Sequence, residues 1–359
     1  MFVNTPMKPV LGIETSCDET AVAVLDGTGR VLAEEVLTQR AEHQAFGGVV
    51  PEIAARAHLH YLPRMVQDVL RQAGIGIADL GAVAATAGPG LIGGLIVGTQ
   101  LAKGIALAGG LPYLAINHLE AHALTARLPD LVPDGARFPY LLFLLSGGHS
   151  QCIAVTGVGQ YHRLGGTIDD AAGEAFDKVA KQLGLGWPGG PALERLALEG
   201  DRATHMFPRP MLRREGCDLS FSGLKTAVIQ TIARTADASL TRRQAADIAA
   251  GFQQAVADVL ADRAAHAMSM MRQRWPAARL LVIAGGVAAN LAIRDALTEA
   301  ADQAGYSLVA PPLRLCSDNA VMVAWAAIER LRLGLTDPMS IDARPRWPLE
   351  TLAARQAPP

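Results

Sequence analysis

The sequence predicts an α/β protein built from two copies of one domain. A strand, a polar turn and two further strands open the chain, and the same series recurs from residue 140. After each opening, helical and strand patterns alternate, which is typical of layered α/β folds. With 359 residues, half of them apolar, the chain can form two such domains, each with its own core.

The first half opens with apolar runs at residues 10–13, 21–25 and 31–37. The short polar turns between them predict an antiparallel meander of strands. Periodicity then changes between helix and strand. The remaining predicted elements of this half are helices at 51–73, 95–108 and 118–126 and strands at 82–86 and 113–116.

The second half repeats this order. Its predicted strands are 140–145, 151–155, 161–165, 280–284 and 308–310, and its predicted helices are 169–183, 190–198, 241–274, 291–304 and 317–333. Gly334 follows the last helix as a stop signal. Residues 338–359 are rich in Pro and Arg, so we expect an irregular tail there.

These patterns predict two lobes that face each other across a central cleft. The first lobe is expected to span residues 1–125, with the closing helix 317–333 packing back near it. The second lobe is expected to span residues 126–316.

The composition excludes several classes of protein. A net charge of −2 excludes a strongly basic nucleic-acid coat protein, although a local basic patch remains possible. The four cysteines form no Cys-x-x-Cys pair, so neither a zinc ribbon nor a disulfide framework is indicated. No signal segment is visible, and the apolar stretch 81–102 is interrupted by glycines and Pro89. We therefore expect a soluble cytoplasmic protein without a membrane span.

The most informative short motif is Asn117-His-Leu-Glu-Ala-His122. On a helix, His118 and His122 lie one turn apart on the same face, where two imidazoles can bind a divalent metal. The alternative is a pair of surface histidines, and the short pattern alone favours it. The motif follows an apolar strand at 111–116 and so lies next to the core, which strengthens the metal interpretation.

Three turns carry further signals. Residues 14–18 and 146–149 each join two predicted strands. The third turn runs from Gly285-Gly286 to Asn290 and leads from a predicted strand into a predicted helix. Glycine pairs and helix N-termini let backbone N–H groups approach an anion. This arrangement resembles the fold of actin, hexokinase and the heat-shock ATPases. Those ATPases usually have Asp in both hairpins, whereas this chain has Glu14 and Ser146.

A set of motifs in a fixed order identifies a closer resemblance. The motifs are His118-Leu-Glu-Ala-His122, Leu144-Leu-Ser-Gly-Gly-His149, Ile168-Asp-Asp-Ala-Ala-Gly-Glu-Ala-Phe-Asp-Lys178, Pro188-Gly-Gly190, Ser220-Phe-Ser-Gly-Leu-Lys-Thr226, Gly285-Gly-Val-Ala-Ala-Asn290 and Cys316-Ser-Asp-Asn319. Together they resemble the tRNA N6-adenosine threonylcarbamoyltransferase family, called TsaD in bacteria and formerly regarded as glycoproteases. One departure is Ala121, where many members have Gly.

The resemblance implies a metal site and a substrate site. Asp318 becomes the third metal ligand beside His118 and His122, supplied by a distant segment so that opposite lobes hold one cation. The implied metal is Fe(II), with Zn(II) as the alternative. The implied substrate contacts are Leu144, Leu145, Ser146, Gly147, Gly148, Asp177, Gly190, Glu194 and Asn290.

The resemblance also implies an acyltransferase reaction. The threonylcarbamoyl group passes from threonylcarbamoyl-AMP to the N6 amine of the adenosine 3′ of the anticodon, in tRNAs that read ANN codons. No residue is clearly a general base, and Glu14 is the candidate we name, with Asp18 and Glu19 beside it. The implied protein partners are a degenerate TsaB-like paralogue and a small TsaE-like ATPase.

Binding of tRNA requires a basic rim. Arg209, Arg213, Arg214 and Lys225 are candidates, and for each of them an ordinary solvated charge is at least as good an interpretation.

Three other functions compete with this prediction. A zinc metalloprotease would use a His-Glu-x-x-His helix, but here Glu120 lies about 160° around the helix from the histidines. A nucleotide-binding scaffold without catalysis would not need the three metal ligands. A kinase of the same fold would need the missing carboxylate of the second hairpin.

Overall fold

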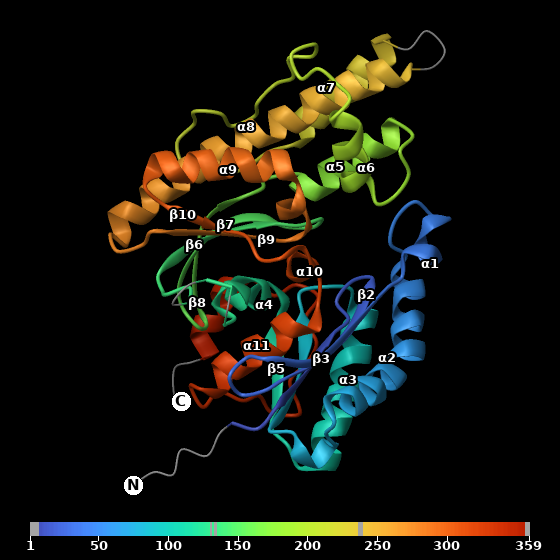
Figure 1. Ribbon diagram of the computed structural model, residues 1–359, viewed down its shortest axis with the longest axis vertical. Helices are drawn as coiled ribbons and strands as arrows, with labels where there is room; N and C mark the ends of the chain where they lie inside the picture. The colour runs from blue at the N-terminus through green and yellow to red at the C-terminus, as the bar shows by residue number, and fades with distance from the viewer. Residues whose placement is uncertain (1–6, 130, 133–134, 236–239, 356–359) are drawn as a thin grey trace. The chain divides into compact units, whose positions relative to one another are not determined.

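The computed structural model describes residues 7–129, 131–132, 135–235 and 240–355 (Figure 1). The chain divides into two compact units. Unit 1 comprises Met1–Ala136, Val158–Tyr161 and Ser317–Pro359, and unit 2 comprises Arg137–Gly157 and His162–Cys316. The turn 158–161 and the segment from residue 317 onward therefore belong with the first part of the chain.

Unit 1 contains a five-stranded sheet in the order β3-β2-β1-β4-β5. Its strands are β1 Val10–Glu14, β2 Glu19–Leu25, β3 Val31–Thr38, β4 Ala82–Gly88 and β5 Tyr113–Asn117. Strands β1 to β3 pair antiparallel, as the meander predicted, whereas β4 pairs parallel with β1 and β5 pairs parallel with β4.

The helices of unit 1 begin and end at recognisable signals. Pro51 starts the longest of them, and Gly74 ends it in the left-handed conformation. The helices are α1 Arg40–Gln44, α2 Pro51–Ala73, α3 Ile92–Gly109, α4 His118–Leu124 and α11 Ala320–Leu331, with short 3-10 turns η1 Ile77–Asp79, η2 Thr125–Arg127 and η4 Leu349–Arg355. The tail that we expected to be irregular thus contains η4.

Unit 2 repeats the architecture of unit 1. Its sheet has the order β10-β9-β6-β7-β8, with β7 antiparallel to β6 and with β9 parallel to both β6 and β10. The strands are β6 Tyr140–Leu145, β7 Ser150–Gly157, β8 Gln160–Gly166, β9 Leu280–Ala284 and β10 Ser307–Val309. The two sheets have the same strand order, which confirms the predicted duplication of an α/β domain.

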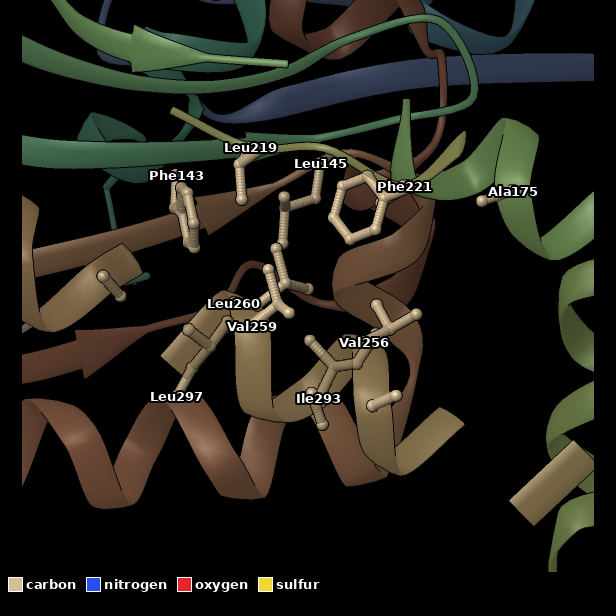
Figure 2. Close-up of a cluster of buried hydrophobic side chains, with 14 of the residues drawn as sticks. Phe143, Leu145, Ala175, Leu219, Phe221, Val256, Val259, Leu260, Ile293 and Leu297 are labelled. Atoms are coloured by element: carbon tan, nitrogen blue, oxygen red, sulfur yellow. The ribbon is translucent and has the colours of Figure 1, made fainter. Parts of the chain in front are cut away.

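Part of the core of unit 2 lies between its sheet and the helices α8 and α9 (Figure 2). Phe143 and Leu145 of β6 face Val256 and Leu260 of α8 and Leu297 of α9, and all five side chains are fully buried. The helices of this unit are α5 Ala172–Gln182, α6 Gly189–Ala197, α7 Ser222–Thr235, α8 Arg242–Arg274, α9 Leu291–Ala304 and α10 Leu313–Cys316, with the 3-10 turn η3 Gly286–Ala289.

Helix α7 was not predicted from the sequence. Leu224, Ala227, Val228 and Ile232 recur at helical spacing and pack on the core of unit 2, so a signal for α7 was present and was missed. The long helix α8 was predicted at 241–274, and the structure shows a capping box of Thr241 and Gln244 at its start.

Helix α3 is the one described helix that is long and apolar enough to cross a membrane by length and composition. Its glycine-rich face instead packs on the first hairpin turn of unit 1, where Thr15 donates a hydrogen bond of 2.9 Å to the carbonyl of Gly94. A β-carbon at Gly98 would lie 2.2 Å from the Thr15 hydroxyl, so this packing requires glycine.

Close packing of α11 on β1 leads to a stability prediction. A β-carbon at Gly12 would lie 2.6 Å from the Ala320 carbonyl oxygen and 2.7 Å from the Ala324 nitrogen. Because these are backbone atoms, G12A must displace α11, and we expect it to lower the free energy of unfolding by about 1–3 kcal/mol in urea titrations. The control G104A adds its methyl group to open space on α3 and should be neutral or stabilising. Equal stability of G12A and G104A would contradict this packing account.

Candidate metal centre and substrate loops

Helix α4 holds the two histidines in the interior of unit 1. All seven of its residues are buried, and it directly follows β5. The side chain of Asn117 caps the helix by accepting hydrogen bonds from the backbone nitrogens of Leu119 and Glu120. The strand and the cap therefore fix where α4 begins, and with it the position of His118.

Asp318 lies next to both histidines, two residues before α11. Its Oδ1 atom is 3.4 Å from His118 Nε2 and 3.3 Å from His122 Nε2. One ligand atom from each of these three residues lies within 4.8 Å of the others. The two imidazole rings stand nearly perpendicular, with centroids 4.8 Å apart.

This geometry fits a divalent metal. Metal–ligand bonds of about 2.0–2.1 Å separate neighbouring ligand atoms in a tetrahedral site by roughly 3.3–3.4 Å. Two imidazole nitrogens and one carboxylate suit Fe(II) or Zn(II) and leave coordination positions open.

The expectation that opposite lobes hold the cation was wrong. His118, His122 and Asp318 all belong to unit 1, because the segment that begins at Ser317 is part of that unit. The carboxylate is distant in sequence but comes from the same compact unit as the imidazoles.

Glu14 orients His118 from the side away from Asp318. Its carboxylate is fully buried at the end of β1, and Oε2 lies 3.1 Å from His118 Nδ1. Thr86 and the backbone nitrogen of Ser16 also donate hydrogen bonds to this carboxylate. Glu14 thus accepts the Nδ1 proton of His118 and leaves the Nε2 lone pair directed at the site, as carboxylates behind metal-binding histidines do.

The charges of the site depend on one another. Burial opposes ionisation of Asp318, yet His118 and His122 hold the pKa of its carboxyl well below the usual range. Burial disfavours the charged form of His118, but Asp318 and Glu14 on either side raise the pKa of this imidazole. For His122 burial dominates and lowers the pKa, which keeps a neutral nitrogen as a potential ligand.

The predicted phosphate loop of unit 2 is a tight turn. The backbone nitrogen of Ser146 donates to the carbonyl of His149, and the His149 nitrogen donates to the Ser146 hydroxyl. Gly147 and Gly148 are exposed, and a β-carbon on either would meet no atom within 4 Å. These two glycines offer accessible backbone to a ligand.

Leu144 and Leu145, unlike the exposed Gly147 and Gly148, lie in the interior of unit 2. Both side chains are fully buried in the core, so only their backbone is available to a substrate.

Other elements of unit 2 meet at this turn. The nitrogen of Gly173 on α5 lies 3.3 Å from the carbonyl of Ser146. Gly285 has φ +92°, and a β-carbon there would lie 2.4 Å from the Leu145 carbonyl oxygen. The first turn of α5, the β6–β7 turn and the Gly285-Gly286 turn are therefore neighbours.

The remaining predicted substrate residues connect the helices of unit 2. Asp177 accepts a hydrogen bond of 2.8 Å from the nitrogen of Gly189, and Glu194 accepts one of 2.7 Å from the nitrogen of Leu291. Asn290 caps α9 and donates to Gln253. Gly190 has open space beside it. Each of the three side chains thus has a structural role that a bound ligand would have to share.

The four predicted basic contacts separate into two classes. Arg209 pairs with Asp258 at 2.9 Å, and Lys225 pairs with Asp170. Arg213 and Arg214 are exposed, and their side chains have no partner among the described residues. The backbone around them is fixed, because Arg263 donates to the Arg214 carbonyl and Asp262 accepts from the Arg213 nitrogen.

Several residues of the metal site were missed by sequence reasoning. The hydroxyl oxygen of Ser16 lies 3.2 Å from His118 Nδ1, and the hydroxyl of Thr86 donates a hydrogen bond to Glu14. Thr86 was detectable in principle: β1 and β4 pair in parallel with Ile13 opposite Ala85, so the next residues of the two strands are neighbours. Ser16 had no comparable signal, since it lies in an irregular turn.

Comparison with known proteins decides the family. The family model described as "TsaD: tRNA N6-adenosine threonylcarbamoyltransferase" matches residues 30–325. The chain belongs to this family. A curated relative with that name from Granulibacter bethesdensis is 64% identical over 347 residues, which cover 95% of this chain and 94% of the relative. Another from Gluconobacter oxydans is 60% identical over 353 residues, with 96% and 94% covered. The resemblance inferred from the motifs is confirmed.

Solved structures support the fold class. HypF from T. kodakarensis aligns with a TM-score of 0.59 and 15% identity over 92% of this chain and 49% of HypF. The (R)-2-hydroxyglutaryl-CoA dehydratase component A from Acidaminococcus fermentans aligns with a TM-score of 0.51 and 18% identity, covering 90% and 99% of the two chains. At these identities the similarity concerns the fold alone, and it agrees with the predicted actin-like and hexokinase-like class.

The position of Glu14 leads to a test of its role. If Glu14 orients His118, E14Q should weaken binding of Co(II) by about 10–100-fold in titrations followed by visible absorption. If Glu14 is instead a general base, E14Q should lower the rate of acyl transfer without changing metal affinity. E52Q, which removes an exposed carboxylate of α2, should change neither quantity.

Proposed function

We propose that this chain transfers the threonylcarbamoyl group of threonylcarbamoyl-AMP to the N6 amine of the adenosine 3′ of the anticodon, in tRNAs reading ANN codons. The observation that carries the proposal is the intact donor set of His118, His122 and Asp318 in a member of this family. Because tRNA is the acceptor, we expect the reaction to take place in the cytoplasm.

The reaction is a displacement at the carbamoyl carbon. The N6 nitrogen forms a bond to this carbon, the bond from the carbon to the phosphate oxygen breaks, and AMP leaves with the electron pair. The amine releases one proton to solvent. Since the donor is an activated mixed anhydride, correct placement of the two reactants supplies much of the acceleration.

Unit 2 offers groups suited to the AMP part of the donor. The exposed backbone of Gly147 and Gly148 adjoins the first turn of α5, where helix N–H groups favour a phosphate. We assign the ribose and adenine contacts to four residues on neighbouring helices or at their starts. These are Asp177, Gly190, Glu194 and Asn290.

Unit 1 offers the residues that would hold a divalent cation, which we propose to be Fe(II), with Zn(II) as the alternative. Such a cation, when bound to His118, His122 and Asp318, stabilises negative charge that develops on an acyl oxygen. Glu14 keeps His118 in the tautomer that presents Nε2 to the site. Three hydrogen-bond donors surround the Glu14 carboxylate, which favours this orienting role over proton abstraction from substrate.

The metalloprotease alternative is disfavoured by the position of Glu120. A protease of that type needs the glutamate of the histidine helix at the metal as a base. Here Glu120 Oε1 accepts hydrogen bonds from the Tyr161 hydroxyl and the Gly159 nitrogen, so its carboxylate is committed elsewhere. A scaffold without catalysis would not require the converging ligands, and a kinase would require a carboxylate at Ser146.

Partner proteins form part of the proposal. On the basis of the family, we propose that a TsaB-like paralogue and a small TsaE-like ATPase act together with this chain.

The proposed reaction is tested with purified chain, unmodified tRNA and threonylcarbamoyl-AMP, with the proposed partners added. Mass spectrometry of the digested tRNA should detect N6-threonylcarbamoyladenosine. Losing a metal ligand removes several kcal/mol of stabilisation, so H118A and D318A should lose about a hundredfold or more in rate. H60A removes an exposed imidazole of α2 and should retain activity. Full activity of H118A would count decisively against the metal centre.

The free arginines of unit 2 provide a test of tRNA binding. If Arg213 and Arg214 contact phosphates, R213A/R214A should weaken tRNA binding and reduce the salt dependence by about one unit of slope per lost contact. R209A should have little effect, because Arg209 is already paired with Asp258. The double variant R56A/R64A removes the same charge from α2, where both arginines pair along the helix, and serves as the matched control. Equal weakening by both double variants would show only a general charge effect.

A further inference from the structure

The face of α4 opposite the candidate metal ligands carries a buried carboxyl group. Glu120 is 1% exposed and lies two residues from each histidine, about 160° around the helix from them. Its Oε1 atom accepts a hydrogen bond of 2.9 Å from the Tyr161 hydroxyl and one of 3.2 Å from the nitrogen of Gly159. The β7–β8 turn, which belongs to unit 1, is therefore hydrogen-bonded to the face of α4 that lies opposite His118 and His122.

The other oxygen of Glu120 faces the end of α11. Arg330 Nη1 lies 3.9 Å from Glu120 Oε2, and the guanidinium also contacts Asp337 at 3.3 Å. Arg330 donates to the carbonyl of Ala115, while Asp337 accepts from the nitrogen of the same residue. This ion pair thus secures β5, the strand that leads directly into α4.

A small polar cavity adjoins these groups. It has a volume of about 60 Å³ and is lined by Glu120, Gly159, Arg330, Leu335, Thr336, Asp337 and Leu352. Glu120 Oε2 has no hydrogen-bond partner among the described residues. The cavity is large enough for ordered water, which would complete the hydrogen bonding of this oxygen.

We propose that Glu120 is a positioning residue, which sets the rotation of α4 and thereby aims His118 and His122 at Asp318. The proposal rests on the metal centre of the proposed function. Helix α4 and helix α11, which directly follows the Asp318 segment, are linked at this residue through Arg330 near the end of α11.

The physical reason is the shortness of α4. A helix of seven residues, about two turns, has little stability of its own, so its orientation depends on tertiary contacts. The Trp325 indole donates to the Leu124 carbonyl and Arg127 pairs with Glu329, and these contacts hold the far end of α4 against α11. The contact of Glu120 on the rear face opposes rolling of the two imidazoles about the helix axis.

The experiment measures metal binding by the full chain, without the transfer reaction. Co(II) titration gives an affinity and a visible spectrum that reports ligand geometry. We expect E120A to bind Co(II) about 10–100-fold more weakly with an altered spectrum, as for other groups behind metal ligands. E120Q keeps an acceptor for Tyr161 and Gly159 and should restore most of the affinity. Y161F, which leaves α4 unchanged, should weaken binding in the same direction by a smaller factor.

A control separates positioning from general stability. Leu62 is fully buried on α2, and L62A should lower the thermal midpoint of unit 1 by creating a cavity. If Glu120 matters only for stability, L62A and E120A should lose Co(II) affinity equally when the two variants have the same thermal midpoint. That outcome would overturn the proposal. Unchanged affinity and spectrum in folded E120A and Y161F would also overturn it, and Y161F decides if E120A does not fold.

Failure of this inference is distinguishable from failure of the proposed metal centre. Wild-type chain that binds no Co(II), or binds it as well as H118A does, would refute the metal centre and this inference with it. Wild type and E120A that bind equally well, with H118A impaired, would refute this inference alone.

Discussion

The candidate metal centre depends on the packing of α11 against β1. This contact brings Asp318 to within 3.3 Å of His122 across 196 residues of sequence. It is possible because Gly12 lets the helix backbone approach the strand, and because α11 is apolar on nearly every side, with Val321, Met322 and Val323 buried. Burial of these side chains supplies the free energy that holds a carboxylate beside two imidazoles.

The same packing explains why the site has an electrostatic need for a cation. Glu14 and Asp318 flank His118 on opposite nitrogens, so two carboxylates share one imidazole in a buried region. Removal of charged groups from water is costly unless opposite charge compensates them. The raised pKa of His118, caused by Asp318 and Glu14 against the effect of burial, shows the compensation that a proton gives. Two carboxylates and two neutral imidazoles around a dication would give a neutral site.

The sequence predicted local features better than distant contacts. The spacing of His118 and His122 revealed their shared face, because helix geometry is local. Asp318 became a candidate ligand only through the family resemblance, since no periodicity links it to α4. The predicted return of the closing helix 317–333 to the first lobe already implied that all three residues belong to one unit, although the resemblance was interpreted as a site shared by both lobes. The phase of Glu120 was visible in the sequence, but its partners Tyr161 and Arg330 lie on elements whose packing had to be known.

The duplicated domains show how one turn can serve two kinds of chemistry. In both units four residues connect the first two strands, 15–18 after β1 and 146–149 after β6. In unit 1 the strand ends in Glu14, whose carboxylate turns inward to His118. In unit 2 the corresponding strand end is the apolar Leu145, and exposed Gly147 and Gly148 follow it. Strand order sets the position of each turn, whereas the side chains set its chemistry. The two turns therefore have equivalent positions, but one presents a buried carboxylate and the other an accessible backbone.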